Sequence, residues 1–327
     1  MKRRDILWST LALGLTRRII GTEKNRTGYV YDEGYLKHKL GLRRGQPHPE
    51  SPERLRRINE ALAANGLDQE LMRIDLFSEP LPQIQQHHTE EHVTSVRQIP
   101  ITGSVAELAA AGALGAVDAV AKKLVKNAFC AIRPPGHHAN NTGREEGFCF
   151  YSNAAIAAKY AQRVHGFVKI LIIDWDYHHG NGTQNAFYED PTVLFFSTHD
   201  WQAYPGTGDP SLTGSGEGHD LNINVHLGCG VKDKGMLSTW DKKLLPAVNK
   251  FEPDFVLISA GFDSRKEDPL GCFEVTDDAF KRMTMMAMEV ANTYCDGRLV
   301  SLLEGGYNVD GQARAVVAHM STLLTHG

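Results

Sequence analysis

Four apolar runs of the sequence each end in a turn that carries ionisable or hydrogen-bonding side chains. AFCAI runs into RPPGHH, KILII into DWDYHHGNG, DFVLISA into GFDS, and LVSLL into EGGYN (residues 128–138, 169–182, 254–264 and 299–308). Near-continuous apolar runs are typical of strands that helices cover on both faces. Because ligands of open α/β sheets bind outside the carboxyl ends of the strands, the four turns are predicted to converge on one site.

The rest of the chain alternates between strand-like and helical patterns. Further strand-like runs occupy residues 29–32, 192–197 and 221–225, and helical patterns occupy residues 51–66, 106–125, 153–164 and 276–294. This alternation predicts β-α units, a mostly parallel sheet and helices on both of its faces. The 327 residues contain no repeat, low-complexity tract or linker, so a single α/β domain is the simplest interpretation.

Composition excludes several classes of partner. A net charge of −4 offers no basic field for nucleic acid. No run is expected to approach the roughly 18 apolar residues of a membrane-spanning helix.

The cysteines are odd in number and widely scattered, which favours reduced thiols over a disulfide framework; they are Cys130, Cys149, Cys229, Cys272 and Cys295.

The N-terminus supports two interpretations. Its sequence, MKRRDILWSTLALGL, has a twin arginine followed by mostly apolar residues 6–15, as in a twin-arginine export signal. Against that, Arg17 and Arg18 follow at once and no A-x-A cleavage site appears. We therefore treat residues 1–27 as an extension or degenerate export signal and 28–327 as the folded domain. We expect a cytoplasmic location, with the periplasm as the alternative.

The stretch DWDYHHG has the spacing of metal ligands. In extended backbone alternate side chains share a face, so Asp176 and His178 can reach one ion together. Asp263, from GFDS, would complete a set of three ligands with one position open, which is the pattern of catalytic zinc. Alone, D-x-D-x-H also fits a solvated loop or a Mg²⁺ site; the neighbouring turns favour a catalytic metal.

The adjacent pair His137 and His138 suits proton transfer beside such a metal. A bound metal lowers the pKa of its water toward about 7, and an imidazole of pKa near 6.5 can take and return the proton. One histidine could act as the shuttle and the other as an electrostatic partner. Each needs an acceptor that fixes its tautomer, and Asp174 and Asn181 are candidates. Tyr307 could offer its phenol to a developing oxyanion.

These motifs resemble those of the histone deacetylase family. RPPGHHA, GFCFYSNAAIAA, DWDYHHGNGTQ, YPGTG, SAGFDS, DPLG and LLEGGY match the family's motifs in order, from about Tyr31 to Tyr307. The resemblance implies the arginase-deacetylase fold, a single domain with an eight-stranded parallel sheet between helices. It also implies a zinc-dependent amidohydrolase that releases acetate from an acetylated amine. Asn181 and DPLG resemble the class II branch and its bacterial relatives, which include acetylpolyamine amidohydrolases.

The resemblance also implies roles for individual residues. The zinc ligands would be Asp176, His178 and Asp263. His138 would be the general base and acid, with Asn181 as its partner, and Asp174 would be the partner of His137. Tyr307 would polarise the scissile carbonyl together with zinc. A K⁺ ion beside the zinc would be held, partly through backbone carbonyls, by Asp174, Asp176, His178, Ser197 and Thr198.

Substrate contacts follow from the same resemblance. Phe148 and Tyr204 would form the aromatic walls of the acyl-lysine tunnel, with Gly147 beside them, although the family usually has phenylalanine at the second wall. Leu270 would overlook the mouth. Arg54 would match an arginine near an internal acetate-release channel.

The chain departs from the family between its histidine-rich HHTEEHV segment and the following helix. Only TSVRQIPITGSV (94–105) stands where the family carries a longer substrate-holding loop, and its polar anchor has no counterpart. The apolar Leu270 favours acetyl-lysine in peptides or proteins, with small acetylated amines such as acetylpolyamines as the alternative. A silent acyl-lysine-binding module and a homo-oligomer stay open. His87, His88 and His92 are expected to be surface or capping groups.

Overall fold

The eight main strands form one parallel sheet in the computed structural model, which describes residues 26–43 and 45–326. The order across the sheet is β4-β1-β5-β10-β9-β6-β7-β8, and every pairing in it is parallel. The strands are β1 (Thr27–Val30), β4 (Met72–Arg73), β5 (Asn127–Cys130), β6 (Ile170–Asp174), β7 (Val193–His199), β8 (Asn222–His226), β9 (Phe255–Ala260) and β10 (Leu299–Leu303). The predicted eight-stranded sheet is confirmed; β4, only two residues long, has no readable period.

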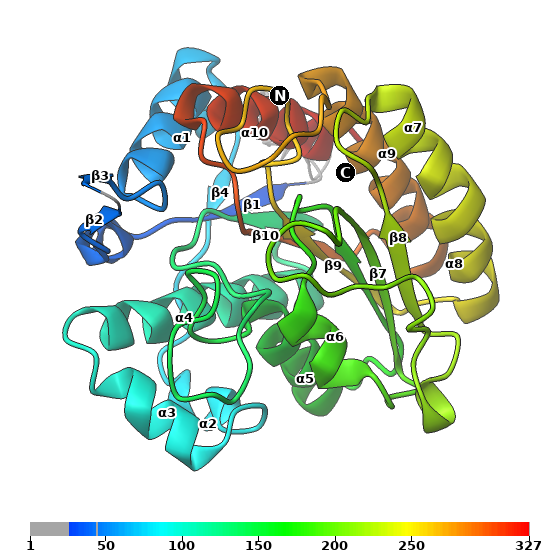
Figure 1. Cartoon of the computed structure of the whole chain (residues 1–327), viewed down its shortest axis with the longest axis horizontal. Coiled ribbons are helices and arrows are strands. Elements are labelled where there is room, and N and C mark those ends of the chain that lie inside the picture. The colour runs from blue at the N-terminus through cyan, green and yellow to red at the C-terminus, as the bar shows by residue number, and fades with distance from the viewer. Residues whose placement is uncertain (1–25, 44, 327) are drawn as a thin grey trace, which may run out of the picture.

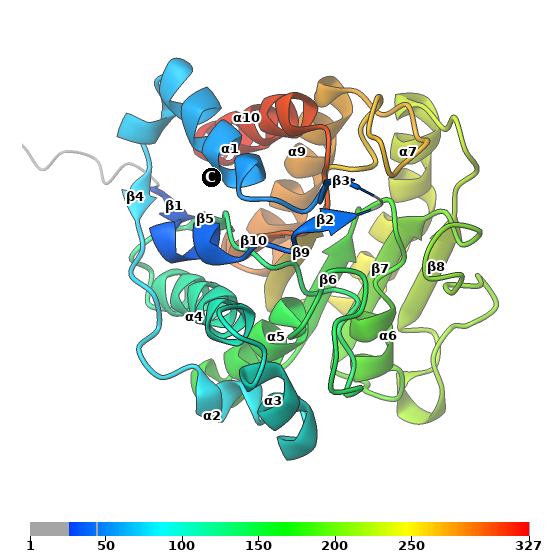
Figure 2. The same ribbon diagram turned by 60° about the vertical axis from the view of Figure 1, so that its left-hand side comes forward.

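Helices cover both faces of the sheet (Figures 1 and 2). One face carries α1 (Glu53–Ala64), α7 (Asp233–Thr239), α8 (Leu245–Phe251), α9 (Asp277–Tyr294) and α10 (Val309–His326). The other carries α4 (Thr102–Ala121), α5 (Asn153–His165) and α6 (Asn181–Phe187), with α2 (Leu81–Ile84) and α3 (Glu90–Arg97) outside them. This double covering explains why the central strands are apolar on both sides.

Helix α4 corrects one expectation. Its 20 residues are long and apolar enough to cross a membrane by length and composition. The expectation that no segment approaches that length is therefore wrong for this helix. However, 72% of its most apolar window is buried inside the protein. It packs against α5 and strands β1 and β5, as expected of the core helix of an α/β domain.

Two further expectations concern the chain ends and the cysteines. Strand β1 begins at Thr27, one residue before the predicted domain start, and the twin-arginine segment lies outside the described residues. The expectation of reduced thiols is wrong for Cys229 and Cys272, which form a disulfide between the loop after β8 and the loop after β9. The sequence does not reveal this pair, because the two cysteines are 43 positions apart and helices α7 and α8 lie between them.

A buried ion network ties α1 to the sheet. Glu50, just before α1, accepts hydrogen bonds from Arg133 Nε at 2.5 Å and Nη2 at 2.6 Å, and from Arg54 Nη1 at 3.3 Å. All three side chains are fully buried. Burial alone would raise the pKa of Glu50, but the charge of Arg133, the hydrogen bond from His38 and the charge of Arg54 hold it well below its usual range.

We predict that Glu50→Gln destabilises the protein by about 3–5 kcal/mol, because it leaves two guanidinium groups buried without their counter-charge. Denaturant unfolding would measure the loss. Glu60→Gln is the control: Glu60 pairs with Arg57 on the exposed side of α1 and should cost at most about 1 kcal/mol. Because the folded pKa of Glu50 is depressed, its contribution is present above the unfolded value of about 4.5 and is lost as pH falls below it. Equal losses for the two variants would contradict the network's role.

Candidate active site

The four turns singled out in the sequence lie at one edge of the sheet. Their strands are the four consecutive neighbours β5-β10-β9-β6, and all of them are parallel. The register pairs Leu303 with Ala260 and Asp174 with Ser259, so these strands end almost level with one another. The predicted convergence of the four carboxyl ends is confirmed by this arrangement.

Asp176, His178 and Asp263 form a compact group of potential metal ligands. Nδ1 of His178 lies 2.9 Å from Asp263 Oδ2 and 3.2 Å from Asp176 Oδ1, and the ligand atoms of the three residues lie within 4.8 Å of one another. Both carboxylates are buried. Three such donors facing one point could hold a divalent cation.

Backbone amides orient the two carboxylates. The amide of Gly305 donates to Asp176 Oδ2 at 2.8 Å, and that of Tyr177 donates to Asp263 Oδ1 at 2.8 Å. Gly305 must lack a side chain, because a Cβ there would lie 2.3 Å from Asp263 Oδ2 and 2.6 Å from Asp176 Oδ2. The first glycine of EGGY thus packs directly against the ligand carboxylates.

The tandem histidines have different partners and different charges. Nδ1 of His137 lies 3.0 Å from Asp174 Oδ2, and Nδ1 of His138 lies 2.8 Å from Asn181 Oδ1. Burial alone lowers the pKa of His137, but the carboxylates of Asp176 and Asp174 raise it well above its usual value. Burial lowers the pKa of His138, and the charge on His137 lowers it further. These opposite directions favour a protonated His137 beside a neutral His138.

A pocket of about 400 Å³ leads to these groups. Its lining contains every predicted substrate residue, namely Gly147, Phe148, Tyr204 and Leu270, together with His138, His178 and Tyr307. The rings of Phe148 and Tyr307 meet edge to face at 5.8 Å, and Tyr204 stands 5.0 Å from the ring of His138. At Gly147, where φ is +53°, a Cβ would lie 2.3 Å from His138 Cδ2. A side chain at that position would displace the ring of His138.

Two charged residues of this pocket were missed in the sequence. Arg43, on β2 (Leu42–Arg43) of the small hairpin with β3 (Gln46–Pro47), stands with its guanidinium 5.3 Å from the centre of the Phe148 ring. Glu145 accepts a hydrogen bond from the amide of Phe148 at 3.2 Å. Arg43 belongs to no motif, and only its folded position reveals it. Residues 94–105 are absent from the pocket lining.

The sequence also contained no sign of the role of Asp268. Its carboxylate accepts from the amides of Tyr307 at 2.7 Å, Asn308 at 3.1 Å and Leu270 at 2.9 Å. It therefore fixes the turn that bears Tyr307 to the loop that bears Leu270. Arg54 supports the same turn from behind, because it donates to the carbonyl of Gly306 at 2.7 Å and to that of Glu304.

The expectation of surface histidines is wrong for His88 and His92, which are buried. His92 lies between the amide of Gly143 (2.9 Å) and the carbonyl of Phe150 (2.7 Å), and His88 Nε2 accepts from the amide of Ser152 at 2.9 Å. These bonds hold both ends of the loop that carries Gly147 and Phe148. Thr89, which follows His88, caps the start of α3 by accepting a hydrogen bond from the amide of His92.

Comparison with known proteins identifies the family. Residues 99–323 match the histone deacetylase domain. A probable deacetylase of Archaeoglobus fulgidus is 39% identical over 301 residues, which cover 87% of this chain and 82% of that protein. The chain belongs to the histone deacetylase family. This deacetylase is therefore a hydrolase of amide bonds, as the motifs implied.

Other relatives of the deacetylase are longer. Histone deacetylase 15 of Arabidopsis thaliana is 38% identical over 91% of this chain, but the match spans only 56% of that protein. The polyamine deacetylase HDAC10 of Danio rerio is 34% identical over 90% of this chain and 47% of its own length. The crystal structure of the HDA15 HD domain superposes with a TM-score of 0.87 at 38% identity, covering 92% of this chain and 88% of that one. The arginase-deacetylase fold is thereby confirmed.

We predict that Gly305→Ala weakens divalent-metal binding by about 10- to 100-fold, because the new methyl group pushes both ligand carboxylates out of place. Competition with a chelator of known affinity would measure the change. Gly228→Ala is the matched control, since a Cβ there meets nothing within 4 Å. Unchanged metal affinity in Gly305→Ala would show that the three residues do not form the metal site.

Proposed function

We propose that this deacetylase is zinc-dependent and removes acetyl groups from lysine side chains of peptides or proteins. The carrying observation is the ligand group Asp176, His178 and Asp263 at the inner end of a pocket with aromatic walls. A pocket with aromatic walls suits a long aliphatic side chain that ends in a neutral amide. Because Tyr307 and both histidines are in place, a silent acyl-lysine reader is disfavoured.

The donor set fits zinc. Two carboxylates and one imidazole are the kind of three-ligand site that leaves a position for substrate or water. When bound, zinc would supply Lewis-acid polarisation of the scissile carbonyl and a lower pKa for water. The chain's part is to keep both carboxylates aimed inward, through the amides of Gly305 and Tyr177.

Proton transfer is assigned to His138. As the neutral member of the pair it can accept a proton from the attacking water, while Asn181 holds its Nδ1. His138 then returns that proton to the departing amine, and acetate is the second product. His137, kept positive by Asp174 and Asp176, stabilises the negative charge that develops on the substrate.

Tyr307 is assigned the hydrogen bond to the oxyanion. Burial raises the pKa of its phenol well above the usual value, with a smaller opposing effect of Arg54, so the hydroxyl keeps its proton and donates. The Arg54 guanidinium lies 5.1 Å from the centre of the Tyr307 ring, and Asp268 holds the Tyr307 amide. These contacts place the phenol before substrate arrives, which is what electrostatic catalysis requires.

We also propose a K⁺ site beside the zinc ligands, formed by Asp174, Asp176, His178, Ser197 and Thr198. Strands β6 and β7 pair Asp174 with Ser197, which puts the two segments side by side. Thr198 Oγ1 is buried and has no hydrogen-bond partner among the described residues. An oxygen-rich pocket with an unsatisfied hydroxyl suits a hard cation.

The residues at the mouth of the pocket favour an acetyl-lysine substrate over an acetylpolyamine. Leu270 is half-buried there and offers nothing to a remote ammonium group. Arg43 places a positive charge at the same rim and would repel such a cation. Glu145 has the opposite effect, because its exposed carboxylate could attract the ammonium group of a polyamine. Acetylpolyamine is the alternative substrate, because one relative is named a polyamine deacetylase.

We predict that the protein releases acetate from acetyl-lysine peptides and that chelation abolishes this release until zinc is restored. Tyr307→Phe keeps the ring and removes one oxyanion donor, so kcat should fall by about 10² to 10³. Steady-state kinetics of acetate formation would measure both effects. Full turnover in metal-free protein, or a loss below about threefold in Tyr307→Phe, would refute the proposed mechanism.

We predict that kcat/KM for acetyl-lysine peptides exceeds that for monoacetylated spermidine or putrescine, and that Leu270→Glu shifts the ratio toward the polyamine. A partly desolvated carboxylate would bind the substrate's remote ammonium more strongly than an exposed ion pair, which is worth about 0–1 kcal/mol. Leu212→Glu is the control, because Leu212 is exposed and lies outside the pocket lining. A tenfold preference of the unmodified enzyme for acetylpolyamine would contradict the argument from Leu270.

A further inference from the structure

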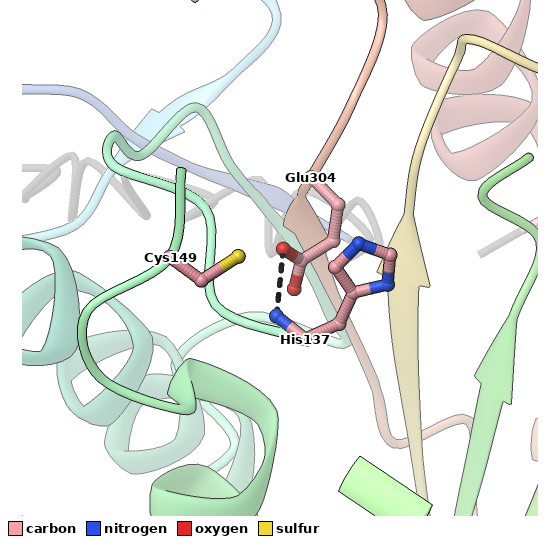
Figure 3. Close-up of side chains that lie close together, drawn as sticks. All are labelled: His137, Cys149 and Glu304. Atoms are coloured by element: carbon pink, nitrogen blue, oxygen red, sulfur yellow. Dashed lines mark hydrogen bonds between the residues drawn. The ribbon is translucent and has the colours of Figure 1, made fainter. Parts of the chain in front are cut away.

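A second cluster of potential metal ligands includes His137, the first of the tandem histidines (Figure 3). Cys149, His137 and Glu304 come from the loop before α5, the turn after β5 and the turn after β10. One ligand atom from each lies within 4.8 Å of the others. The cysteine and the glutamate are fully buried, and the histidine is only 3% exposed.

Glu304 has one oxygen in use and one without a partner. Oε2 accepts from the amides of Gly136 at 2.6 Å and His137 at 3.2 Å. Oε1 is buried and has no hydrogen-bond partner among the described residues. A buried acceptor without a partner is unfavourable, so this oxygen is a candidate ligand atom.

Cys149 and His137 also have atoms that could bind a metal and that make no strong hydrogen bond. The Cys149 thiol makes one weak contact, 3.5 Å to the carbonyl of Gly147. His137 uses Nδ1 toward Asp174, which leaves Nε2 available; its nearest recorded acid is Asp176 Oδ1, 3.9 Å away. Thiolate, imidazole and carboxylate are the three ligand types that bind Zn²⁺ in proteins.

We propose that Cys149, His137 Nε2 and Glu304 form a second, inhibitory zinc site that fills when free zinc rises above the level that loads Asp176, His178 and Asp263. Binding forms a Zn–S bond and a Zn–N bond and releases to solvent both the thiol proton of Cys149 and the Nε2 proton of the His137 imidazolium, so two protons leave for each ion bound. The incoming ion takes the imidazole that otherwise supplies positive charge to the reaction, and turnover falls. Only this inhibitory consequence rests on the proposed deacetylase function; the binding does not.

Cobalt binding tests the site without an activity measurement. In the purified full-length protein, Co²⁺ at Asp176, His178 and Asp263 meets only oxygen and nitrogen, whereas Co²⁺ at the second site meets sulfur. A near-ultraviolet sulfur-to-cobalt charge-transfer band should therefore appear with the second equivalent, and the stoichiometry should reach about two ions per chain. Cys149→Ala and Cys149→Ser should abolish the band and lower the stoichiometry by one.

Cys130→Ala is the matched control, because Cys130 is an equally buried thiol outside both clusters and should leave band and stoichiometry unchanged. A band that persists in both Cys149 variants, or no band at saturating cobalt in the unmodified protein, would overturn the proposal. Folding of each variant is checked by its unfolding curve. Cys149→Ser preserves side-chain size if the alanine variant is unstable.

Inhibition by zinc tests the consequence. With free zinc set by a metal buffer, the concentration that halves acetate release should rise at least tenfold in Cys149→Ala and stay unchanged in Cys130→Ala. Equal zinc inhibition in all three proteins would overturn the inhibitory role. If no acetylated substrate is turned over but the cobalt band depends on Cys149, the zinc site stands and the proposed substrate class fails.

Discussion

Everything at the active site depends on the parallel pairing of four neighbouring strands. In a parallel ladder all chains run the same way, so β5, β10, β9 and β6 must end at one edge of the sheet. Short turns then suffice to bring together residues as distant as His138, Asp176, Asp263 and Tyr307. The same pairing requires helices on both faces, and this explains why the apolar α4 is a core helix.

The burial of many charged groups at this edge follows from that arrangement. Isolated carboxylates are costly to bury, so each is matched by donors. Asp176 and Asp263 receive backbone amides, Glu304 receives two more, and Glu50 is paired with Arg133 and Arg54. Among the described residues, Glu304 Oε1 has no such donor, and Asp176, His178 and Asp263 place their ligand atoms close together. We expect a cation at each of these two places, as well as at the proposed K⁺ site.

The mouth of the pocket is built differently from its floor. Arg43 comes from a small hairpin, Glu145 and Phe148 from the loop held by His88 and His92, and Leu270 from the loop held by Asp268. None of these segments is a strand of the central sheet. The proposed substrate contacts therefore lie on loops that buried polar side chains hold in place, whereas the proposed metal ligands and the tandem histidines follow strands of the sheet.

The sequence by itself determined the sheet strands with long apolar runs, the convergence of their ends and the polar residues that meet there. Each of these follows from a local pattern in the sequence. Buried strands are apolar, and Asp176 and His178 are two residues apart, so their side chains share one face of extended backbone. It left out β4, which is too short to show a period, and the buried roles of His88 and His92. Only the tertiary structure decided that Arg43 reaches Phe148, that Asp268 fixes Tyr307, that Cys229 pairs with Cys272, and that Cys149 faces Glu304. Those contacts join residues 39 to 155 positions apart, and no local pattern records which distant side chains the packing of a core will bring together.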